Sequence, residues 1–194
     1  MSSTPKFMIL IFIFSIVSLG YGVRQASQCA GLDEDVTILQ SYWLEDARFI
    51  EGLFYDTPSN RYFESYGLPG ESGIRSYILD DEEQEVSDIQ TLYNNPTAEF
   101  AEGIAVIGTT LYQLTYRTGN IHVFDDYTQD QLIETANMAM PRDADCLVPE
   151  GWGLTSDDTY LYMTDGTARV FRINPVDLQP FDQAEFDTAY GPGE

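Results

Sequence analysis

The chain has 194 residues, with 32 acidic side chains against 9 Lys and Arg, and a formal net charge of −23. A surface this acidic repels the phosphates of nucleic acids and anionic lipid headgroups, so we expect neither as a partner. At this length a single folded domain is the natural expectation.

Residues 1–22 predict a secretory signal peptide, because Lys6 precedes the apolar run Phe7–Val17 and small residues follow it. A short membrane anchor is the alternative, but the run falls short of the ~20 apolar residues that span a bilayer. We therefore expect a secreted or secretory-pathway protein that has no membrane contact after cleavage. The mature chain would contain no lysine, because Lys6 is the only one.

Cys29 and Cys146 are the only two cysteines. In a secreted chain they could form a disulfide or stay unpaired, since their separation in sequence carries no geometric information. Two thiols without further Cys or His ligands do not predict a zinc site.

Three similar stretches organise residues 23–175 and predict a partial β-propeller. The stretches are FIEGLFYD from Phe49, FAEGIAVIGTTLYQLTY from Phe100 and EGWGLTSDDTYLYMTDG from Glu150. Their Glu-Gly pairs begin at residues 51, 102 and 150, which gives spacings of 51 (102 − 51) and 48 (150 − 102). Repeats of this length are typical of a propeller or a solenoid, and the lack of a strict short period favours the propeller.

Each repeat predicts strands separated by turn-forming residues. We expect the blades at about residues 49–80, 100–136 and 150–175. Residues 23–48 read as a lead-in with one strand, and 176–194 as an acidic tail or the start of a truncated blade. The strands expected in the three repeats are Leu53–Tyr55, Arg61–Ser65 and Ile74–Leu79; those around Ile104 and Leu111, with Ile121–Phe124 and an outer Thr128–Ala136; and Gly153–Thr155, Tyr160–Thr164 and Arg169–Ile173. Residues 137–149 are expected to form a loop.

The sequence resembles the plant and bacterial type of glutaminyl-peptide cyclotransferase. The blocks that carry the resemblance occur in family order from Phe49 to Pro175: FIEGLFYD, YFESYGLPGESGIRSY, FAEGIAVIGTTLYQLTYRTGNIHVFD and EGWGLTSDDTYLYMTDGTARVFRINP. The resemblance implies an all-β, five-bladed propeller of which about three blades are present here. The open sheet edges would then mean either an incomplete chain or one that assembles with itself.

The resemblance also implies a reaction, which converts the N-terminal glutamine of a peptide to pyroglutamate and releases ammonia. One carboxylate within reach of both nitrogens could take the proton from the attacking amine and give it to the leaving ammonia. Matched to the family motif, that carboxylate is Glu102. The resemblance places Phe49, Glu51, Tyr116 and Trp152 in the substrate pocket.

The chain departs from the family pattern at several of these positions. Glu51 stands where the family usually has glutamine, and a second carboxylate near Glu102 would raise one of the two pKa values. Tyr116 replaces the usual tryptophan, and the family's later lysine has no counterpart. The chemistry requires no cofactor. Family members can hold a structural metal ion in the central channel, and the sequence does not identify its ligands here.

Competing functions stay open from the sequence. A non-catalytic secreted propeller fragment would bind peptides or a partner without releasing ammonia, and a lactonase-like hydrolase would need calcium ligands that the motifs do not show. The only histidine, His122, is expected to be a plain strand residue and not a base, because no nucleophile elbow accompanies it. The oligomeric state and the natural peptide are not predicted.

Overall fold

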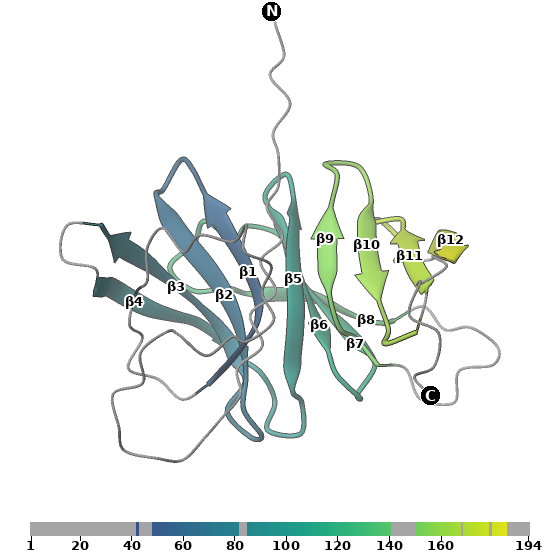
Figure 1. The fold of residues 1–194 in the computed structure, drawn as a ribbon, viewed down its shortest axis with the longest axis horizontal. Coiled ribbons are helices and arrows are strands. Elements are labelled where there is room, and N and C mark those ends of the chain that lie inside the picture. The colour runs from purple at the N-terminus through teal and green to yellow at the C-terminus, as the bar shows by residue number, and fades with distance from the viewer. Residues whose placement is uncertain are drawn as a thin grey trace, which may run out of the picture. The chain divides into compact units, whose positions relative to one another are not determined.

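The structure is a computed structural model that describes Tyr42 and residues 48–81, 85–140, 150–167, 169–178 and 180–185. The described residues form twelve strands in three four-stranded sheets, with no helix among them (Figure 1). Within this part of the chain, no helix long and apolar enough to cross a membrane occurs. The predicted signal peptide, both cysteines and most of the lead-in lie outside the described residues.

The first sheet has the order β1-β2-β3-β4 and is antiparallel throughout. Its strands are β1 (Phe49–Asp56), β2 (Arg61–Gly67), β3 (Gly73–Asp80) and β4 (Glu85–Asn94). The predicted turn after Tyr55 closes because Asp56 Oδ2 accepts a hydrogen bond from Ser59 N at 3.0 Å, and Asn60 takes a positive φ of 56°. The sequence analysis predicted three strands here. β4 was missed, and it extends this unit from the expected end near residue 80 to Asn94.

The second sheet repeats the arrangement in the order β5-β6-β7-β8. Its strands are β5 (Ala101–Ile107), β6 (Thr110–Thr115), β7 (Asn120–Phe124) and β8 (Glu134–Ala139). The expected outer strand Thr128–Ala136 was placed too early, because Asp126 accepts hydrogen bonds from Thr128 and Gln129 and so holds a turn there. Residues 137–139, expected in a loop, belong to β8, where they pair with residues 120–122 of β7.

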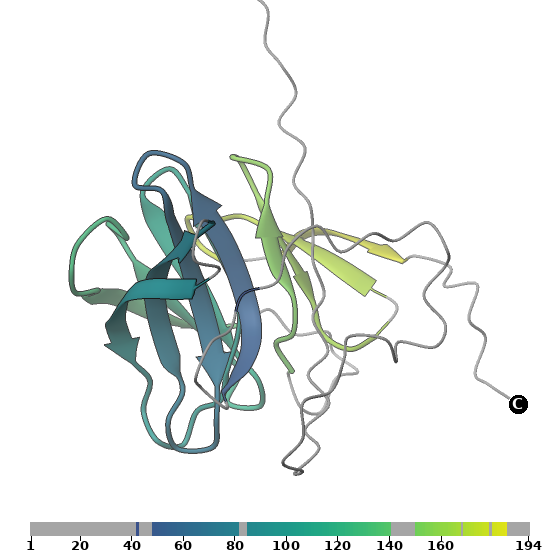
Figure 2. The same cartoon turned by 60° about the vertical axis from the view of Figure 1, so that its left-hand side comes forward.

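The third sheet has the order β12-β11-β10-β9. Its strands are β9 (Leu154–Ser156), β10 (Leu161–Thr164), β11 (Arg169–Ile173) and β12 (Pro180–Glu185). The first three agree closely with the predicted strands. β12 pairs with β11 from Arg169 to Ile173, so residues expected in an acidic tail form the fourth strand of this sheet. Strands that follow one another in sequence are neighbours in each sheet, as in a meander, and Figure 2 shows the same ribbon from a second side.

Successive side chains along each strand of the second sheet point to opposite faces, and both faces of this sheet carry apolar side chains. Toward the first sheet it presents Ile104, Leu111 and Phe124, which pack with Phe63 and Ile74. Its other face packs against the third sheet and buries a second set of side chains, among them Tyr112, Leu114, Ile121, Val123, Leu161, Met163 and Phe171. The core therefore lies between sheets. The first strands of successive sheets are in contact, β1 with β5 and β5 with β9.

Candidate active site

The Glu-Gly pairs at residues 51 and 102 meet where β1 and β5 lie side by side, and Gly103 also lies against the start of β9. The glycines permit this close approach. A Cβ on Gly52 would lie 2.6 Å from Ile104 N, and one on Gly103 would lie 2.4 Å from Leu154 N. The Gly103 amide also donates to the carbonyl oxygen of Trp152 at 2.9 Å. Glu51 and Glu102 are thus held where neighbouring sheets are in contact.

Glu51 and Glu102 are brought together from different sheets and share a side-chain hydrogen bond. Glu102 is buried, with 8% of its surface exposed, whereas Glu51 is half-buried. Burial, the charge of Glu51 and the hydrogen bond to it, and the charge of Glu150 raise the pKa of Glu102 to about 9. Burial also raises the pKa of Glu51, although the bond that it accepts from Glu102 offsets part of this effect.

Four aromatic rings form a continuous row beside the acid pair. The ring of Phe100 lies 6.4 Å from Phe49 on one side and 6.4 Å from Tyr116 on the other, measured between centroids. Tyr116 then meets Trp152 edge to face at 5.8 Å and 89°. The sequence-predicted residues Phe49, Tyr116 and Trp152 are therefore adjacent through Phe100, which the sequence analysis did not assign to the site.

The backbone fixes the two middle rings of this row. The amide of Tyr116 donates to the carbonyl oxygen of Phe100 at 2.9 Å, and the amide of Gly151 donates to the carbonyl oxygen of Tyr116 at 2.9 Å. Gly67 makes room for Phe100, because a Cβ there would lie 2.3 Å from the ring. The row is thus built from all three sheets.

A charged rim lies at the Trp152 end of the row. Arg117 Nε donates to Glu150 Oε1 at 3.1 Å, and Arg117 Nη2 donates to the hydroxyl of Tyr116 at 3.0 Å. The indole Nε1 of Trp152 donates to the other oxygen of Glu150 at 3.4 Å. Trp152 is 42% exposed, so the row opens to solvent at this end.

Sequence reasoning missed Phe100, Arg117 and Glu150. Two of them carried a usable signal, since Phe100 and Glu150 belong to the repeated blocks FAEGI and EGWGL. Arg117 carried none, because only folding brings its side chain to Glu150.

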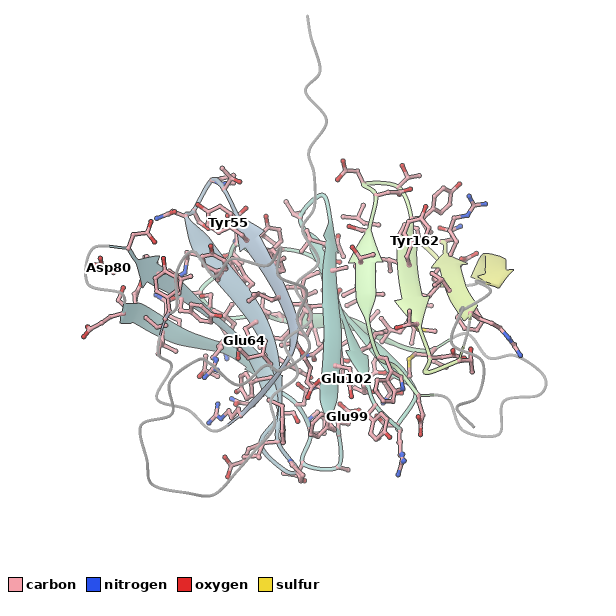
Figure 3. All side chains as sticks on the ribbon, viewed as in Figure 1. Tyr55, Glu64, Asp80, Glu99, Glu102 and Tyr162 are labelled. Carbon is pink, nitrogen blue, oxygen red and sulfur yellow. The ribbon has the colours of Figure 1, made fainter. Side chains whose placement is uncertain are left out.

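Figure 3 shows Glu102 and Glu99 near the same end of the sheets, away from Tyr55 and Tyr162.

A cavity of about 370 Å³ lies elsewhere, against the turn after β1 and the segment after β7. Its lining includes Asp56, Arg61 and Tyr127 but no member of the acid pair or the aromatic row. These polar groups already have partners, since the Tyr127 hydroxyl donates to Asp56 at 2.9 Å and Arg61 Nε donates to Ser76 at 3.1 Å. We therefore take the acid pair and the aromatic row as the candidate site.

Known proteins similar to this chain include glutaminyl cyclases. A glutaminyl-peptide cyclotransferase from Arabidopsis thaliana is 22% identical over 175 residues, which cover 90% of this chain and 50% of that protein. The crystal structure of Myxococcus xanthus glutaminyl cyclase aligns with a TM-score of 0.53 and 22% identity, over 71% of this chain and 51% of that one. A putative 6-phosphogluconolactonase from Bacteroides uniformis aligns with a TM-score of 0.51 and 14% identity, over 78% and 47% of the two chains.

These likenesses define an all-β protein of antiparallel sheets whose fold is consistent with a β-propeller. The family model described as glutamine cyclotransferase matches residues 15–190. The chain belongs to the glutamine cyclotransferase family, as its sequence motifs indicated. It spans about half the length of the relatives it matches.

Proposed function

We propose that this chain is a glutaminyl-peptide cyclotransferase, acting on peptides or proteins that begin with glutamine. The observation that carries the proposal is the pairing of Glu51 with Glu102 beside a row of four aromatic rings. An aromatic slot can hold the flexible glutamine side chain folded toward its own amine and exclude water. A buried carboxylate beside that slot can move the proton.

The reaction needs one proton transferred between two nitrogens. The neutral α-amine attacks the side-chain amide carbon, and the ionised Glu102 carboxylate takes a proton from it as the new C–N bond forms. Glu102 then gives that proton to the amide nitrogen as its bond to carbon breaks and ammonia leaves. The carboxylate is regenerated, so no cofactor is required.

The wider context is part of the same proposal. We place the protein in the secretory pathway or outside the cell, and its sheets in a propeller of the five-bladed type. We assign no nucleic-acid or membrane partner. Among the described residues, no group of three or more His, Cys, Asp or Glu could hold a metal ion, and the proposed reaction uses none.

The raised pKa of Glu102 favours a second candidate, a non-catalytic peptide-binding protein. With a pKa of about 9, Glu102 is mostly protonated at neutral pH and is then a hydrogen-bond donor, not a base. A site in that state binds the amine and amide of a glutaminyl end without turning it over. This candidate predicts peptide binding with no release of ammonia at any pH at which the chain stays folded.

The deciding experiment measures pyroglutamate by mass spectrometry and ammonia by a coupled assay, from pH 7 to about pH 9.5. The purified chain is incubated with a glutaminyl peptide, and the enzyme-free rate of spontaneous cyclisation is subtracted. A peptide that begins with asparagine and the Glu102→Gln variant serve as controls. Rates above background only for wild type with the glutaminyl peptide support the cyclotransferase. Saturable binding without product supports the second candidate.

A further inference from the structure

His122 lies at the centre of a buried polar cluster that the proposed reaction does not use. It lies on β7, facing the first sheet, and none of its surface is exposed. Its Nε2 is 2.6 Å from Glu99 Oε2, and its Nδ1 is 3.0 Å from Glu134 Oε1. The expectation of a plain strand residue was right about the strand but missed these two carboxylates.

If both carboxyl groups are ionised, both ring nitrogens must donate to satisfy them, and only the imidazolium form has two N–H groups. Glu134 is present as the ionised acceptor. Its burial opposes ionisation, but hydrogen bonds from His122 and Tyr93 outweigh that effect and lower its pKa. Asn137 Nδ2 also lies 3.2 Å from Nδ1, and the same amide hydrogen-bonds Glu134.

The charged and titratable groups that face His122 come from each element packed on it. From β4, the Tyr93 ring lies 5.7 Å away, with its hydroxyl donating to Glu134 Oε2 at 2.9 Å. From the connection between β4 and β5 comes Glu99, which is 7% exposed, and from β8 comes Glu134. The cluster therefore places one imidazole ring between two carboxyl groups.

Glu99 connects this cluster to the candidate active site. Its Oε1 accepts from Asn120 Nδ2 at 2.7 Å, and its Oε2 accepts from Asn95 Nδ2 at 3.3 Å as well as from His122. Glu99 directly precedes Phe100, the ring between Phe49 and Tyr116, and stands three residues before Glu102. The contacts that hold Glu99 against β7 therefore fix the position of the chain that leads into Phe100 and Glu102.

We propose that His122 is a positioning residue, held as an imidazolium that clamps Glu99 and Glu134 and thereby fixes Phe100 and Glu102 in the site. The effect on catalysis rests on the proposed function, whereas the clamp itself does not. A displacement of about 1 Å at reacting groups costs up to about a hundredfold in rate. Loss of the clamp should therefore lower kcat/KM by roughly tenfold to a hundredfold.

The first test needs no variant, because His122 is the only histidine of the chain. Histidine labelled with ¹⁵N in the full chain, purified without a histidine tag, gives a single pair of ring signals. We expect both nitrogens to carry slowly exchanging protons at pH 7.5. A neutral tautomer, with one unprotonated ring nitrogen, would overturn the clamp.

The second test compares His122→Gln and Glu99→Gln with Ile121→Val as a control. Ile121 is fully buried on the same strand but contacts the other sheet interface, and its variant should cost ~1 kcal/mol of stability. We expect both clamp variants to lower kcat and the control to leave it within about twofold. Equal kinetics in all three folded variants would overturn the positioning role.

A third readout separates failure of the clamp from failure of the proposed function. In a Trp43→Phe background, Trp152 is the only tryptophan, and acrylamide quenching reports its exposure. We expect Glu99→Gln to change the quenching constant through Phe100 and Tyr116, and Ile121→Val to leave it unchanged. This measurement applies even if no peptide is cyclised. An unchanged constant in Glu99→Gln would overturn the connection from Glu99 to the aromatic row.

Discussion

The carboxyl groups of Glu51 and Glu102, on the first strands of two different sheets, are hydrogen-bonded to each other in a largely buried site. Such a pair favours sharing a proton, because two hydrogen-bonded carboxyl groups cannot both ionise without strong repulsion between their like charges. The pair therefore sets the pH at which Glu102 ionises.

Replacing Glu102 by glutamine should separate activity from stability. Pyroglutamate formation should fall by about 10²- to 10⁴-fold, because the amide cannot carry the proton. Wild-type Glu102 has a folded pKa of about 9, above its value of 4.5 in the unfolded chain. Its contribution to stability is complete below pH 4.5 and is lost as pH rises toward about 9. Glu102→Gln should thus gain stability over wild type as pH rises, by at most about 1.4 kcal/mol for each pH unit between the two pKa values.

Urea unfolding of both proteins at pH 5 and pH 8.5 measures that difference in stability. The assay described above measures the difference in activity. Near-normal turnover by Glu102→Gln would remove Glu102 from the proposed mechanism. A stability difference that stays constant with pH would show that Glu102 ionises as it does in the unfolded chain.

Glu51→Gln should shift the pH dependence of kcat/KM toward lower pH. The charge of Glu51 and its hydrogen bond both raise the pKa of Glu102, so their removal lowers that pKa and makes the base available nearer neutrality. The measurement is kcat/KM from pH 6 to about pH 10, which reports the free enzyme. Glu71→Gln, at an exposed loop position, is the matched charge control and should leave the profile in place. An unshifted profile in Glu51→Gln would argue against coupling.

Phe100→Leu should raise KM by about tenfold through loss of the central ring of the aromatic row. The matched control is Phe63→Leu, which alters a ring of similar size in the core between the first two sheets. Both variants should lose stability, and only Phe100→Leu should raise KM for a glutaminyl peptide. Equal KM values in the two variants would mean that the row does not contact the substrate.

Gly103→Ala should destabilise the contact between the second and third sheets. The new Cβ would lie 2.4 Å from Leu154 N and 2.7 Å from the carbonyl oxygen of Trp152, and backbone atoms cannot move aside independently. We expect a loss of about 1–3 kcal/mol or more in urea unfolding. Gly153→Ala is the control, because its Cβ would meet only the Thr164 hydroxyl at 3.1 Å. Similar stability in the two variants would contradict the packing described here.

Glu64→Gln should show what the buried ion pair of the first sheet contributes. Glu64 accepts from Arg75 Nη2 at 2.6 Å, and both side chains are almost fully buried. Removing one charge of such a pair costs about 3–5 kcal/mol, because the other charge stays buried. Asp88→Asn breaks the exposed pair with Arg61 and should change the unfolding midpoint little. A small effect of Glu64→Gln would show that the site remains hydrated.

Local patterns in the sequence were sufficient for most inner strands. β2, β3, β7, β10 and β11 fall within a residue or two of the strands expected, because apolar alternation and turn residues act over short distances. β4 and the shifted β8 lacked that signal. β4 is an outermost strand whose side chains are mainly exposed and polar, so little in its composition distinguishes it from a loop.

Motifs such as FAEGI and EGWGL are local strings, so the sequence alone was enough to indicate the family, the repeat and the candidate site residues. Tertiary structure decided which of them meet. Glu51 reaches Glu102, Phe100 joins Phe49 to Tyr116, and His122 lies between Glu99 and Glu134 only when sheets stack with one register. The physical reason is that strand alternation assigns side chains to a face, whereas packing between faces joins residues far apart in sequence.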